Sequence, residues 1–441
     1  MFPSYNGTDT IYALSSGAGR GGVAVIRVSG VKVLDVINHL SGLDNPQPRY
    51  AYFRKLSNQA GEALDNALVL YFKAPYSFTG EDVVEFQVHG GRSVINAVMG
   101  AISEVKGCRP AEPGEYSRRA VVNGKMDLTE AEGLMDLINA ETQLQRAQAY
   151  TQMNGALGKK YEGWRKDLKH HMAYLEAFID FPEEDIPSEK LDRIDTDVRE
   201  LAKKIAEHLN DNKVGQKLRD GFQIAIVGRP NAGKSSLINA LTQKDVAIVS
   251  QTAGTTRDVV EAHLDVAGFP VILADTAGLR EGAEEIETEG IRRAVKRAEE
   301  ADLVLHVQDG SRYPVTEKLP ATLQDKKVIT IWNKVDEMTE IPAGVLCLSA
   351  KMGQGVDALW QLIKQELNDN ISTSDGVITR ERYRVALEEC MDSLSRSLYA
   401  PELELKAEDL RMAARALGRI TGRIDTDELL DVIFRDFCIG K

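Results

Sequence analysis

Cysteine is scarce in this sequence, and long apolar runs are absent from it. The 441 residues include four cysteines, at positions 108, 347, 390 and 438, scattered without the spacing of a zinc site. We expect them to be reduced thiols of a cytoplasmic protein. No apolar run approaches the roughly 18 residues that cross a bilayer, and no signal-peptide pattern opens the chain. The sequence therefore predicts no membrane association.

An excess of positive charge is lacking as well. The chain has 54 lysines and arginines against 67 aspartates and glutamates, a net charge of -13. This argues against nucleic-acid binding over the whole surface, although a local basic patch would still hold RNA, because affinity follows local phosphate contacts. With 43% hydrophobic and 27% charged residues the composition is that of a soluble globular protein, and the length predicts about two to four domains.

The first half of the chain changes once from a pattern of short strands to a pattern of long helices. Residues 1–120 carry short strand-like runs between glycine and proline turns, with helix-like stretches between them, and this predicts an α+β domain. The strand-like runs are GVAVIRVSG, ALVLYF and DVVEFQVHGG. From about residue 127 apolar residues recur at three- and four-residue spacing, which predicts long amphipathic helices. The clearest examples are MDLTEAEGLMDLINAETQLQRAQAYTQM and LDRIDTDVRELAKKIAEHLN.

From Phe222 short apolar strands alternate with helices, in QIAIVG, PVILADT, DLVLHVQD, KVITIWNK and GVLCLSA. This rhythm predicts a doubly wound, mostly parallel sheet covered on both faces. Helical periodicity resumes after about Gly376, in RVALEECMDSLSRSL and EDLRMAARALGRI. We therefore expect a multidomain α/β protein in which an α/β domain (216–376) is inserted into an all-α helical domain. The two parts of that helical domain are residues 121–215 and 377–441, and the α+β domain is residues 1–120.

The segment GRPNAGKS (228–235) fits the phosphate-loop pattern G-x-x-x-x-G-K-[ST]. It follows an apolar strand and precedes the helical run SLINAL, which is the context that this motif requires. Backbone N–H groups of such a loop hold phosphates, while Lys234 reaches the β- and γ-oxygens and Ser235 binds magnesium. The residues that we expect to contact the nucleotide here are Asn231, Ala232, Gly233, Lys234, Ser235 and Ser236.

Two further motifs belong to the phosphate side of the site. DTAG (275–278) follows the strand PVILA, and this places Asp275 near the magnesium and Gly278 near the γ-phosphate. TTRD (255–258) supplies Thr256, a second candidate magnesium ligand on a loop that would order with the γ-phosphate.

The next two motifs select the base. In NKVD (333–336), Asp336 can accept from guanine N1–H and the exocyclic amine, while Asn333 helps to hold the loop and Lys334 lies between them. Adenine presents the wrong donors, so GTP is favoured over ATP. SAK (Ser349, Ala350, Lys351) ends the next strand and would brace the base. Five motifs in order, each at the carboxyl end of a strand, predict a GTPase domain.

One catalytic group of Ras-like GTPases is missing. The position of their water-orienting glutamine is Leu279, which cannot position water or carry charge. Hydrolysis is then either very slow or assisted from elsewhere. Asn231 offers a side-chain oxygen for a monovalent cation that would neutralise developing charge. An acid of EGAEEIETEG (281–290) would orient the water, unless this run is only a solvated acidic loop.

Polar residues in the first domain also point to a site. In VVEFQVHGG the strand period places Glu85, Gln87 and His89 on one face, which is either a solvent-facing surface or the wall of a site. Arg27 interrupts an apolar strand and needs a carboxylate partner or an anionic ligand. The segment RPAEPGEYSRRAVVNGKMDL adds a basic cluster that includes Lys125. These features suggest a site for a small anion-bearing molecule.

The chain ends in DFCIGK, which places Cys438 near the terminus. A prenylation box is disfavoured, because the pattern would need an aliphatic residue at Gly440 and the last residue is Lys441. A reactive thiol, a packed cysteine and a frayed end stay open. The preceding DELLDVIFRDF predicts a helix with an apolar face that would deliver the tail to a packed position.

These residues together resemble the MnmE (TrmE) family of tRNA-modification GTPases, nearly from end to end. The resemblance rests on GRGGVAVIRVSG, SFTGEDVVEFQVHGG, RPAEPGEYSRRAVVNGKMDL, FIDFPEED, GRPNAGKSSLINAL, AGTTRD, DTAGLRE and FCIGK. It implies a tetrahydrofolate-binding N-terminal domain, a helical domain and an inserted GTPase domain. It also implies a homodimer through the N-terminal domains and a flavin-dependent partner protein, MnmG (GidA). The implied reaction installs an aminomethyl or carboxymethylaminomethyl group at C5 of wobble uridine 34 in certain tRNAs, with a folate carbon.

The resemblance also implies roles for particular residues. The folate contacts are Arg27, Glu85, Lys125 and Lys441, and Cys438 is a candidate catalytic thiol. Potassium is implied at Asn231 with Ser250, Thr252 and Thr255, and magnesium at Ser235 and Thr256. The water-orienting acid is Glu287, and pairing of two GTPase domains activates hydrolysis. A GTP-dependent RNA-binding assembly switch, of the ribosome-biogenesis type, is the alternative; such a switch would need neither a folate site nor the terminal thiol.

Overall fold

The computed structural model describes residues 9–17, 19, 21–181, 189–243, 261–275, 295–316, 318–338, 340–341, 344–369, 377–423, 430, 433–434 and 437–440. Two compact units share the chain, and each is described by itself. The first comprises Met1–Met135, Gly158–Lys166 and Arg415–Lys441, and the second Asp136–Leu157 and Asp167–Ala414. The sequence-based domain boundaries at residues 120, 215 and 376 stay predictions.

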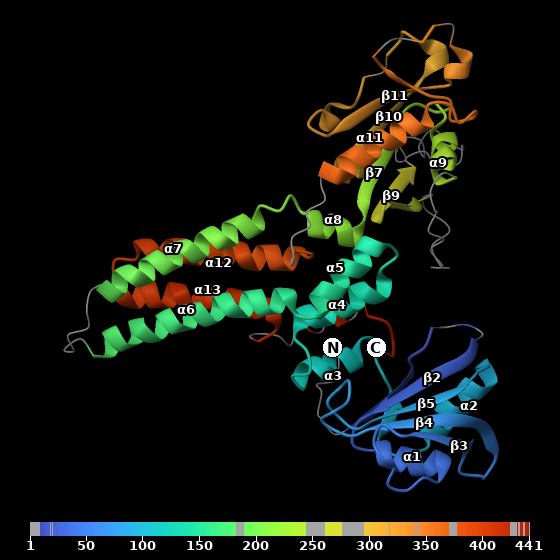
Figure 1. Cartoon of the computed structure of the whole chain (residues 1–441), viewed down its shortest axis with the longest axis vertical. Helices are drawn as coiled ribbons and strands as arrows, with labels where there is room; N and C mark the ends of the chain where they lie inside the picture. The colour runs from blue at the N-terminus through green and yellow to red at the C-terminus, as the bar shows by residue number, and fades with distance from the viewer. Residues whose placement is uncertain are drawn as a thin grey trace, which may run out of the picture. The chain divides into compact units, whose positions relative to one another are not determined.

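The first unit contains a six-stranded sheet, drawn in blue in Figure 1, with strand order β3-β4-β5-β2-β1-β6. Neighbouring strands are antiparallel except for the parallel pair β1 and β6. Helices α1 (Val33–Ser41) and α2 (Arg92–Ser103) bury their apolar faces against it. The strands are β1 (Thr10–Leu14), β2 (Gly21–Ser29), β3 (Ala51–Ser57), β4 (Ala63–Phe72), β5 (Val83–Gly90) and β6 (Cys108–Pro110).

The alternation predicted for β5 is confirmed. Phe86 and Val88 are buried in the core, whereas Glu85, Gln87 and His89 face the other side and are partly or fully exposed. Arg27 is expected to need a carboxylate partner or an anionic ligand. Strand β2 pairs with β5 so that Arg27 and Glu85 lie opposite each other, and Glu85 supplies the carboxylate.

The segment expected to form one long helix after residue 126 is broken in two. Helix α4 (Leu128–Asn139) ends before Thr142, and α5 (Gln143–Met153) begins after it. Thr142 and Gln145 form a capping box, in which the threonine hydroxyl accepts from the Gln145 backbone N–H and the glutamine side chain accepts from the Thr142 N–H. The apolar periodicity runs through this break, which is why it alone did not reveal the boundary.

The helices predicted in LDRIDTDVRELAKKIAEHLN, RVALEECMDSLSRSL and EDLRMAARALGRI are present, whereas DELLDVIFRDF lies mostly outside the described residues. In the second unit α7 (Glu189–Leu209) and α12 (Glu381–Tyr399) pack side by side, and Lys406 of α13 (Leu403–Thr421) pairs with Asp195 of α7 (Figure 1). Helix α6 (Ala156–Asp180) precedes them, and the short α3 (Glu115–Val122) belongs to the first unit. Among the described residues no helix combines the length and apolar character needed to cross a bilayer.

A second six-stranded sheet has the order β12-β11-β10-β7-β9-β8. Its strands are parallel except for β8, which is antiparallel to β9. Ile224 and Ile226 enter one core with α9 (Lys234–Thr242) and α11 (Val356–Asp369), whereas Ala225 packs on the opposite face. Both faces are therefore covered, as predicted. The strands are β7 (Phe222–Val227), β8 (Glu261–Val266), β9 (Phe269–Asp275), β10 (Leu303–Asp309), β11 (Val328–Asn333) and β12 (Leu346–Cys347).

Candidate functional site

The segment 228–233 connects strand β7 to helix α9, and its backbone is sharply bent. Gly228, Asn231 and Gly233 have φ of +152°, +65° and +90°, a conformation that favours glycine and, next, asparagine. Lys234 is buried, and its Nζ donates to the carbonyl oxygens of Gly228 (2.8 Å) and Arg229 (2.9 Å). The ammonium group thus lies inside the loop at the amino end of α9, where backbone N–H groups and a cation together favour phosphate.

Asn333 joins three of the sequence motifs. Its side chain is buried, its Nδ2 donates to the Ala232 carbonyl oxygen (2.9 Å) and its Oδ1 accepts from the Ala350 N–H (3.0 Å). One amide therefore links the phosphate loop, the NKVD segment and the SAK segment. A β-carbon at Gly233 would overlap Asn333 Nδ2, so the loop and the amide fit closely together.

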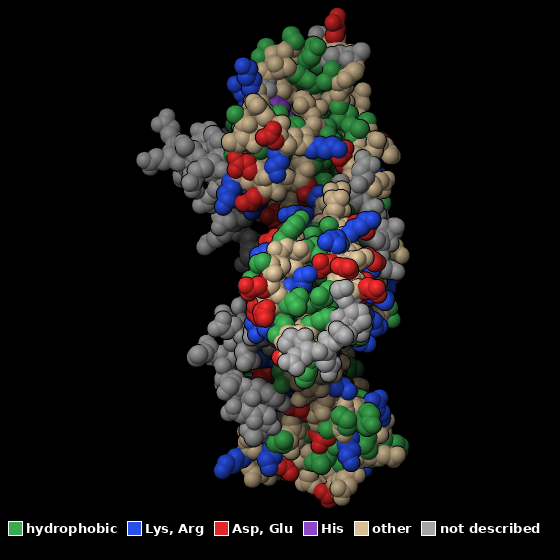
Figure 2. Space-filling model, turned by 90° about the vertical axis from the view of Figure 1, so that its left-hand side faces the viewer, with side chains coloured by type: hydrophobic (Ala, Val, Ile, Leu, Met, Phe, Trp, Pro, Cys, Tyr) green, Lys and Arg blue, Asp and Glu red, His purple; other side chains and the backbone are tan. Residues whose placement is uncertain are grey.

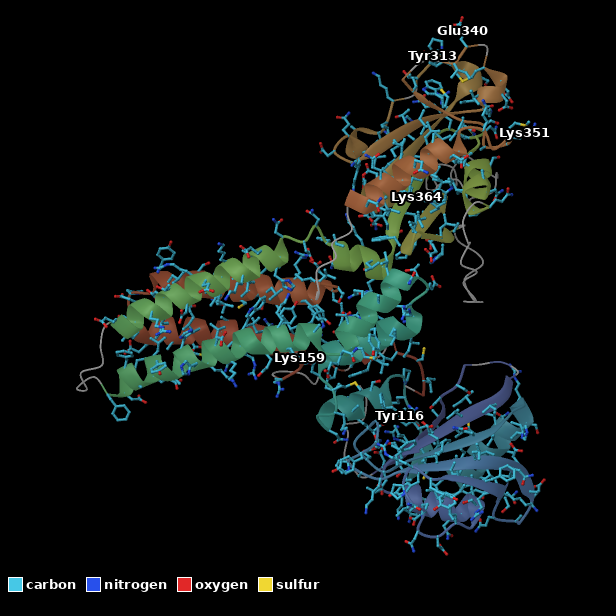
Figure 3. All side chains as sticks on the ribbon, in the orientation of Figure 1. Tyr116, Lys159, Tyr313, Glu340, Lys351 and Lys364 are labelled. Carbon is cyan, nitrogen blue, oxygen red and sulfur yellow. The ribbon has the colours of Figure 1, made fainter. Side chains whose placement is uncertain are left out.

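The next residues present an exposed carboxylate at the same edge of the sheet. Lys334 has φ of +65° and its Nζ pairs with Asp309 Oδ2 at 2.7 Å, while the Val335 N–H donates to the Leu348 carbonyl (3.1 Å). The Ser349 hydroxyl, followed by smaller effects that include nearby lysine charge, lowers the pKa of the exposed Asp336 carboxyl. Asp336 is therefore an ionised acceptor beside the SAK segment, whose Lys351 is labelled in Figure 3.

Asp309 is a residue of this site that the sequence reasoning missed. It ends β10 beside Asn333 of β11, holds Lys334, and accepts from the Ser311 N–H. The sequence feature that could have identified it is its position: Asp309 is the last residue of a buried parallel strand and precedes a glycine. Ligands of α/β folds bind at the carboxyl ends of such strands.

In the first unit Arg27 and Glu85 form a charged pair between two aromatic rings. Arg27 Nε and Nη2 donate to Glu85 Oε1 at 3.0 and 2.8 Å, and the guanidinium lies 5.5 Å from the Phe78 ring centre and 5.7 Å from that of Tyr116. Burial raises the pKa of Tyr116, so its hydroxyl stays protonated and donates to the Arg27 carbonyl (2.7 Å).

Lys125 comes to the same side through the loop that precedes β5. Its Nζ donates to the Pro75 carbonyl (2.9 Å), and its side chain covers Gly80. Phe78 lies in the same loop, so Lys125 and the Arg27–Glu85 pair both contact the segment 75–80 or its side chains.

Two arginines of the predicted basic cluster form ion pairs within the fold. Arg119 is 1% exposed and pairs with Asp9, Glu81 and Glu115, while Arg109 pairs with Asp9 and Glu115. A buried guanidinium requires such partners. These two charges are neutralised inside the fold. Arg27, which is partly exposed and has Glu85 as its carboxylate partner, and Lys125 are cations of the candidate anion site.

The described part of the terminal segment is bound to the first unit. Ile439 forms an antiparallel bridge with Pro113, the Gly114 N–H donates to the Cys438 carbonyl (3.3 Å), and Ser15 Oγ donates to the Gly440 carbonyl (2.9 Å). A frayed end is therefore wrong for residues 437–440. Cys438 itself is exposed, whereas burial raises the pKa of Cys390 to about 12.

Comparisons with known proteins agree along the whole chain. Residues 10–125 match the profile of the GTP-binding protein TrmE N-terminus, and residues 128–438 match that of the MnmE helical domain. The tRNA modification GTPase MnmE of Paramagnetospirillum magneticum is 52% identical over 441 residues, 98% of this chain and 100% of that protein. The chain belongs to the MnmE family. It is a P-loop GTPase with the multidomain α/β fold expected from its sequence.

Mitochondrial proteins belong among its relatives too. The rat and human 5-taurinomethyluridine-[tRNA] synthase subunits GTPB3 are 46% and 45% identical over 459 residues, which is 98% of this chain and 93% of each relative. This MnmE-family chain therefore shares its full domain set with bacterial and mitochondrial proteins.

Several predicted site residues of this MnmE-family chain lie outside the described residues. They are Ser250, Thr252, Thr255, Thr256, Gly278, Leu279, Glu287 and Lys441, together with the side chain of Asp275. The backbone of Asp275 ends β9 and is paired with Ile226 of β7, so it lies next to the start of the phosphate loop. Ser235 and Ser236 are exposed on the first turn of α9, and Asn231 is exposed in the loop.

The described groups fit a nucleotide with its magnesium ion. The exposed Ser235 hydroxyl follows Lys234 directly, and hydroxyl oxygens are ligands that magnesium accepts beside phosphate oxygens. Asn231 offers an amide oxygen, which suits potassium.

Proposed function

We propose that this chain is a potassium-stimulated GTPase that acts in the cytoplasm on tRNA. With the flavoprotein MnmG it would install an aminomethyl or carboxymethylaminomethyl group at C5 of wobble uridine 34, with carbon from a 5,10-methylene or 5-formyl tetrahydrofolate. The observation that supports it most is the presence on one chain of an NKVD segment held against the phosphate loop by Asn333 and a separate Arg27–Glu85 pair in the N-terminal domain. An assembly switch would need only the first.

Each site has a proposed division of labour. Lys234, Ser235 and the loop N–H groups bind the phosphates and magnesium, with Thr256 and Asp275 completing the set. Asn333 and Asp336 read guanine, and Glu287 orients water. Arg27, Glu85, Lys125 and Lys441 bind the folate. A homodimer through the N-terminal domains is part of this proposal, and exposed Phe53 and Tyr50 at the edge strand β3 offer apolar area for it.

Mass spectrometry of wobble uridine tests this function. In cells that lack the protein we expect uridine 34 of the affected tRNAs to lose its C5 substituent, and the gene supplied in trans should restore it. Unchanged wobble uridine in the deletion strain would refute the proposed function, whatever the GTPase activity of the purified protein.

Potassium dependence is the first prediction. GTP turnover should be at least about 10-fold faster in KCl than in NaCl at equal ionic strength, because a bound cation of the right size would neutralise the charge that develops in the transition state. Asn231→Ala should remove the difference between the two salts. Equal steady-state rates in the two salts for the wild-type protein would contradict the cation site.

The terminal thiol gives the second prediction. Cys438 is exposed, so Cys438→Ser removes little packing and should leave the melting temperature, GTP turnover and folate binding unchanged. We expect loss of wobble-uridine modification, because a hydroxyl is a far weaker nucleophile than a thiolate. Cys347→Ser is the matched control for a cysteine in the GTPase domain, and it should retain modification. Full modification by the Cys438 variant would leave the sulfur without a chemical role.

A further inference from the structure

The first unit carries a row of cations, all exposed except the half-buried Arg419, on or just after two helices that touch each other. Near residue 162 the start of α6 lies beside the end of α13, because Arg423 Nε and Glu162 Oε2 are 3.5 Å apart. The outward residues of α13 recur about once per turn, and so do those of α6. We name this surface the basic stripe: Lys159, Lys166, Arg415, Arg419 and Arg423. Lys159 is labelled near the start of α6 in Figure 3.

Glu162 and Glu130 are acidic residues that lie beside the basic stripe. Glu162 is engaged by Arg165, whose Nε and Nη2 donate to it at 2.9 and 2.8 Å, and by Arg423. Glu130 lies close enough to Lys159 for the two charges to interact. Elsewhere the charges mix: on the face drawn in Figure 2, positive and negative side chains alternate over the described residues. On a chain with a net charge of -13, five cations on neighbouring turns are a local exception.

The same stretch breaks two rules of helix stability. Gly163 is exposed inside α6, one turn from Lys159 and one turn from Lys166, and a β-carbon there would meet nothing within 4 Å. Packing therefore does not require a glycine, although glycine disfavours a helix. The first turn of α6 also lacks an acidic residue, and Lys159 stands near it, where the helix dipole disfavours a cation. An exposed glycine inside a helix and a cation in its first turn both lower helix stability, and packing requires neither of them. Such unfavourable choices in one place are typical of functional surfaces.

The character of the basic stripe favours a nucleic acid over a protein face. Protein interfaces are rich in exposed aromatic and apolar anchors and poor in lysine. None of the large exposed hydrophobic side chains among the described residues falls within 158–166 or 415–423. Regularly spaced lysines and arginines around an open glycine suit a sugar-phosphate backbone, which gains from close approach and from many separate phosphate contacts.

We propose that the basic stripe binds the phosphate backbone of tRNA. This inference rests on the proposed function for the identity of the RNA, and it assigns that contact to α6 and α13. Phosphate contacts hold and orient the RNA without reading its sequence. Residues outside the basic stripe then select among tRNAs, and the stripe binds every tRNA substrate with similar affinity.

A charge-removal variant of the full-length protein tests the proposal. The triple variant Lys159→Gln, Lys166→Gln and Arg415→Gln spares Arg423, which pairs with Glu162, and Arg419 at the helix end. Binding of an unmodified tRNA transcript is measured by fluorescence anisotropy at several KCl concentrations. We expect affinity at low salt to fall at least about 10-fold, and the slope of log K against log salt to decrease by about two to three. GTP turnover and the melting temperature report the fold and should not change.

The matched control removes three exposed cations from α7 and α12: Lys203→Gln, Lys204→Gln and Arg396→Gln. It changes the net charge equally and should keep the wild-type slope. A second pair of variants tests whether the RNA must approach the backbone closely at Gly163, without any change of charge. Gly163→Leu should weaken tRNA binding without loss of stability, while Gly100→Leu, at an equally open glycine of α2, should not.

The outcomes are distinct. Equal slopes for the triple variant and the wild-type protein would overturn the proposal, and so would equal losses in the triple variant and its control. A triple variant that loses binding to the flavoprotein but keeps its tRNA affinity would overturn it in favour of a protein interface. Normal wobble uridine in deletion cells would refute the proposed function alone, since the stripe could still bind tRNA in the anisotropy assay.

Discussion

Replacement of Asp336 by asparagine is expected to lower GTP affinity at least about 100-fold and to make xanthosine triphosphate the better ligand. Ser349 keeps the pKa of the Asp336 carboxyl low, so the group is an ionised acceptor on the surface of the site. Two charge-assisted hydrogen bonds to guanine N1–H and the exocyclic amine would be lost, and the new amide would place an N–H against the amine. Xanthine carries a carbonyl at that position and can accept from the amide.

Titration of the Asp336→Asn variant with fluorescent guanosine and xanthosine nucleotides measures this change. Glu337→Gln is the matched control, since it neutralises the adjacent exposed carboxylate and should leave both affinities unchanged. Asp336 is exposed, so the variant should keep the melting temperature of the wild-type protein. Unaltered GTP affinity in Asp336→Asn would refute the base-reading role of this carboxylate.

The sequence predicted most of the GTPase sheet because its parallel strands are buried on both faces and read as apolar runs. It missed β8, whose six residues, EAHLDV, alternate polar and apolar side chains at the edge of the sheet. Such an edge strand is specified by its antiparallel partner β9 rather than by its own composition. Of β12 only Leu346 and Cys347 pair in the sheet, although a longer apolar run surrounds them.

The site was predictable as a set of motifs but not as a connected structure. Spacing identified Asn333 and Ala350, yet only tertiary geometry shows that one amide links the phosphate loop to the SAK segment. In the N-terminal domain the sequence could not separate partly exposed arginines from fully buried ones. Arg119 and Arg27 are both charges in apolar surroundings, and burial with three carboxylates distinguishes the first from the second.

Substitution of Gly233 by alanine is expected to abolish GTP binding. A β-carbon there would overlap Asn333 Nδ2, and φ of +90° strains any residue other than glycine. Asn333 would have to move, with loss of its hydrogen bonds to Ala232 and Ala350, each worth about 1–3 kcal/mol when the partner group is left buried. The expected loss of affinity exceeds about 100-fold, measured by calorimetry.

Gly344→Ala is the control for a glycine of positive φ elsewhere in the GTPase domain, because Gly344 has φ of +79° but a β-carbon there would meet nothing within 4 Å. It carries the backbone strain without the collision and should bind GTP nearly as well as the wild-type protein. The double variant Gly233→Ala with Asn333→Ala tests the coupling directly. If the alanine acts by displacing the asparagine, the double variant should bind GTP no worse than Asn333→Ala alone. Additive losses would show instead that Gly233 contributes through the loop backbone, independently of the amide.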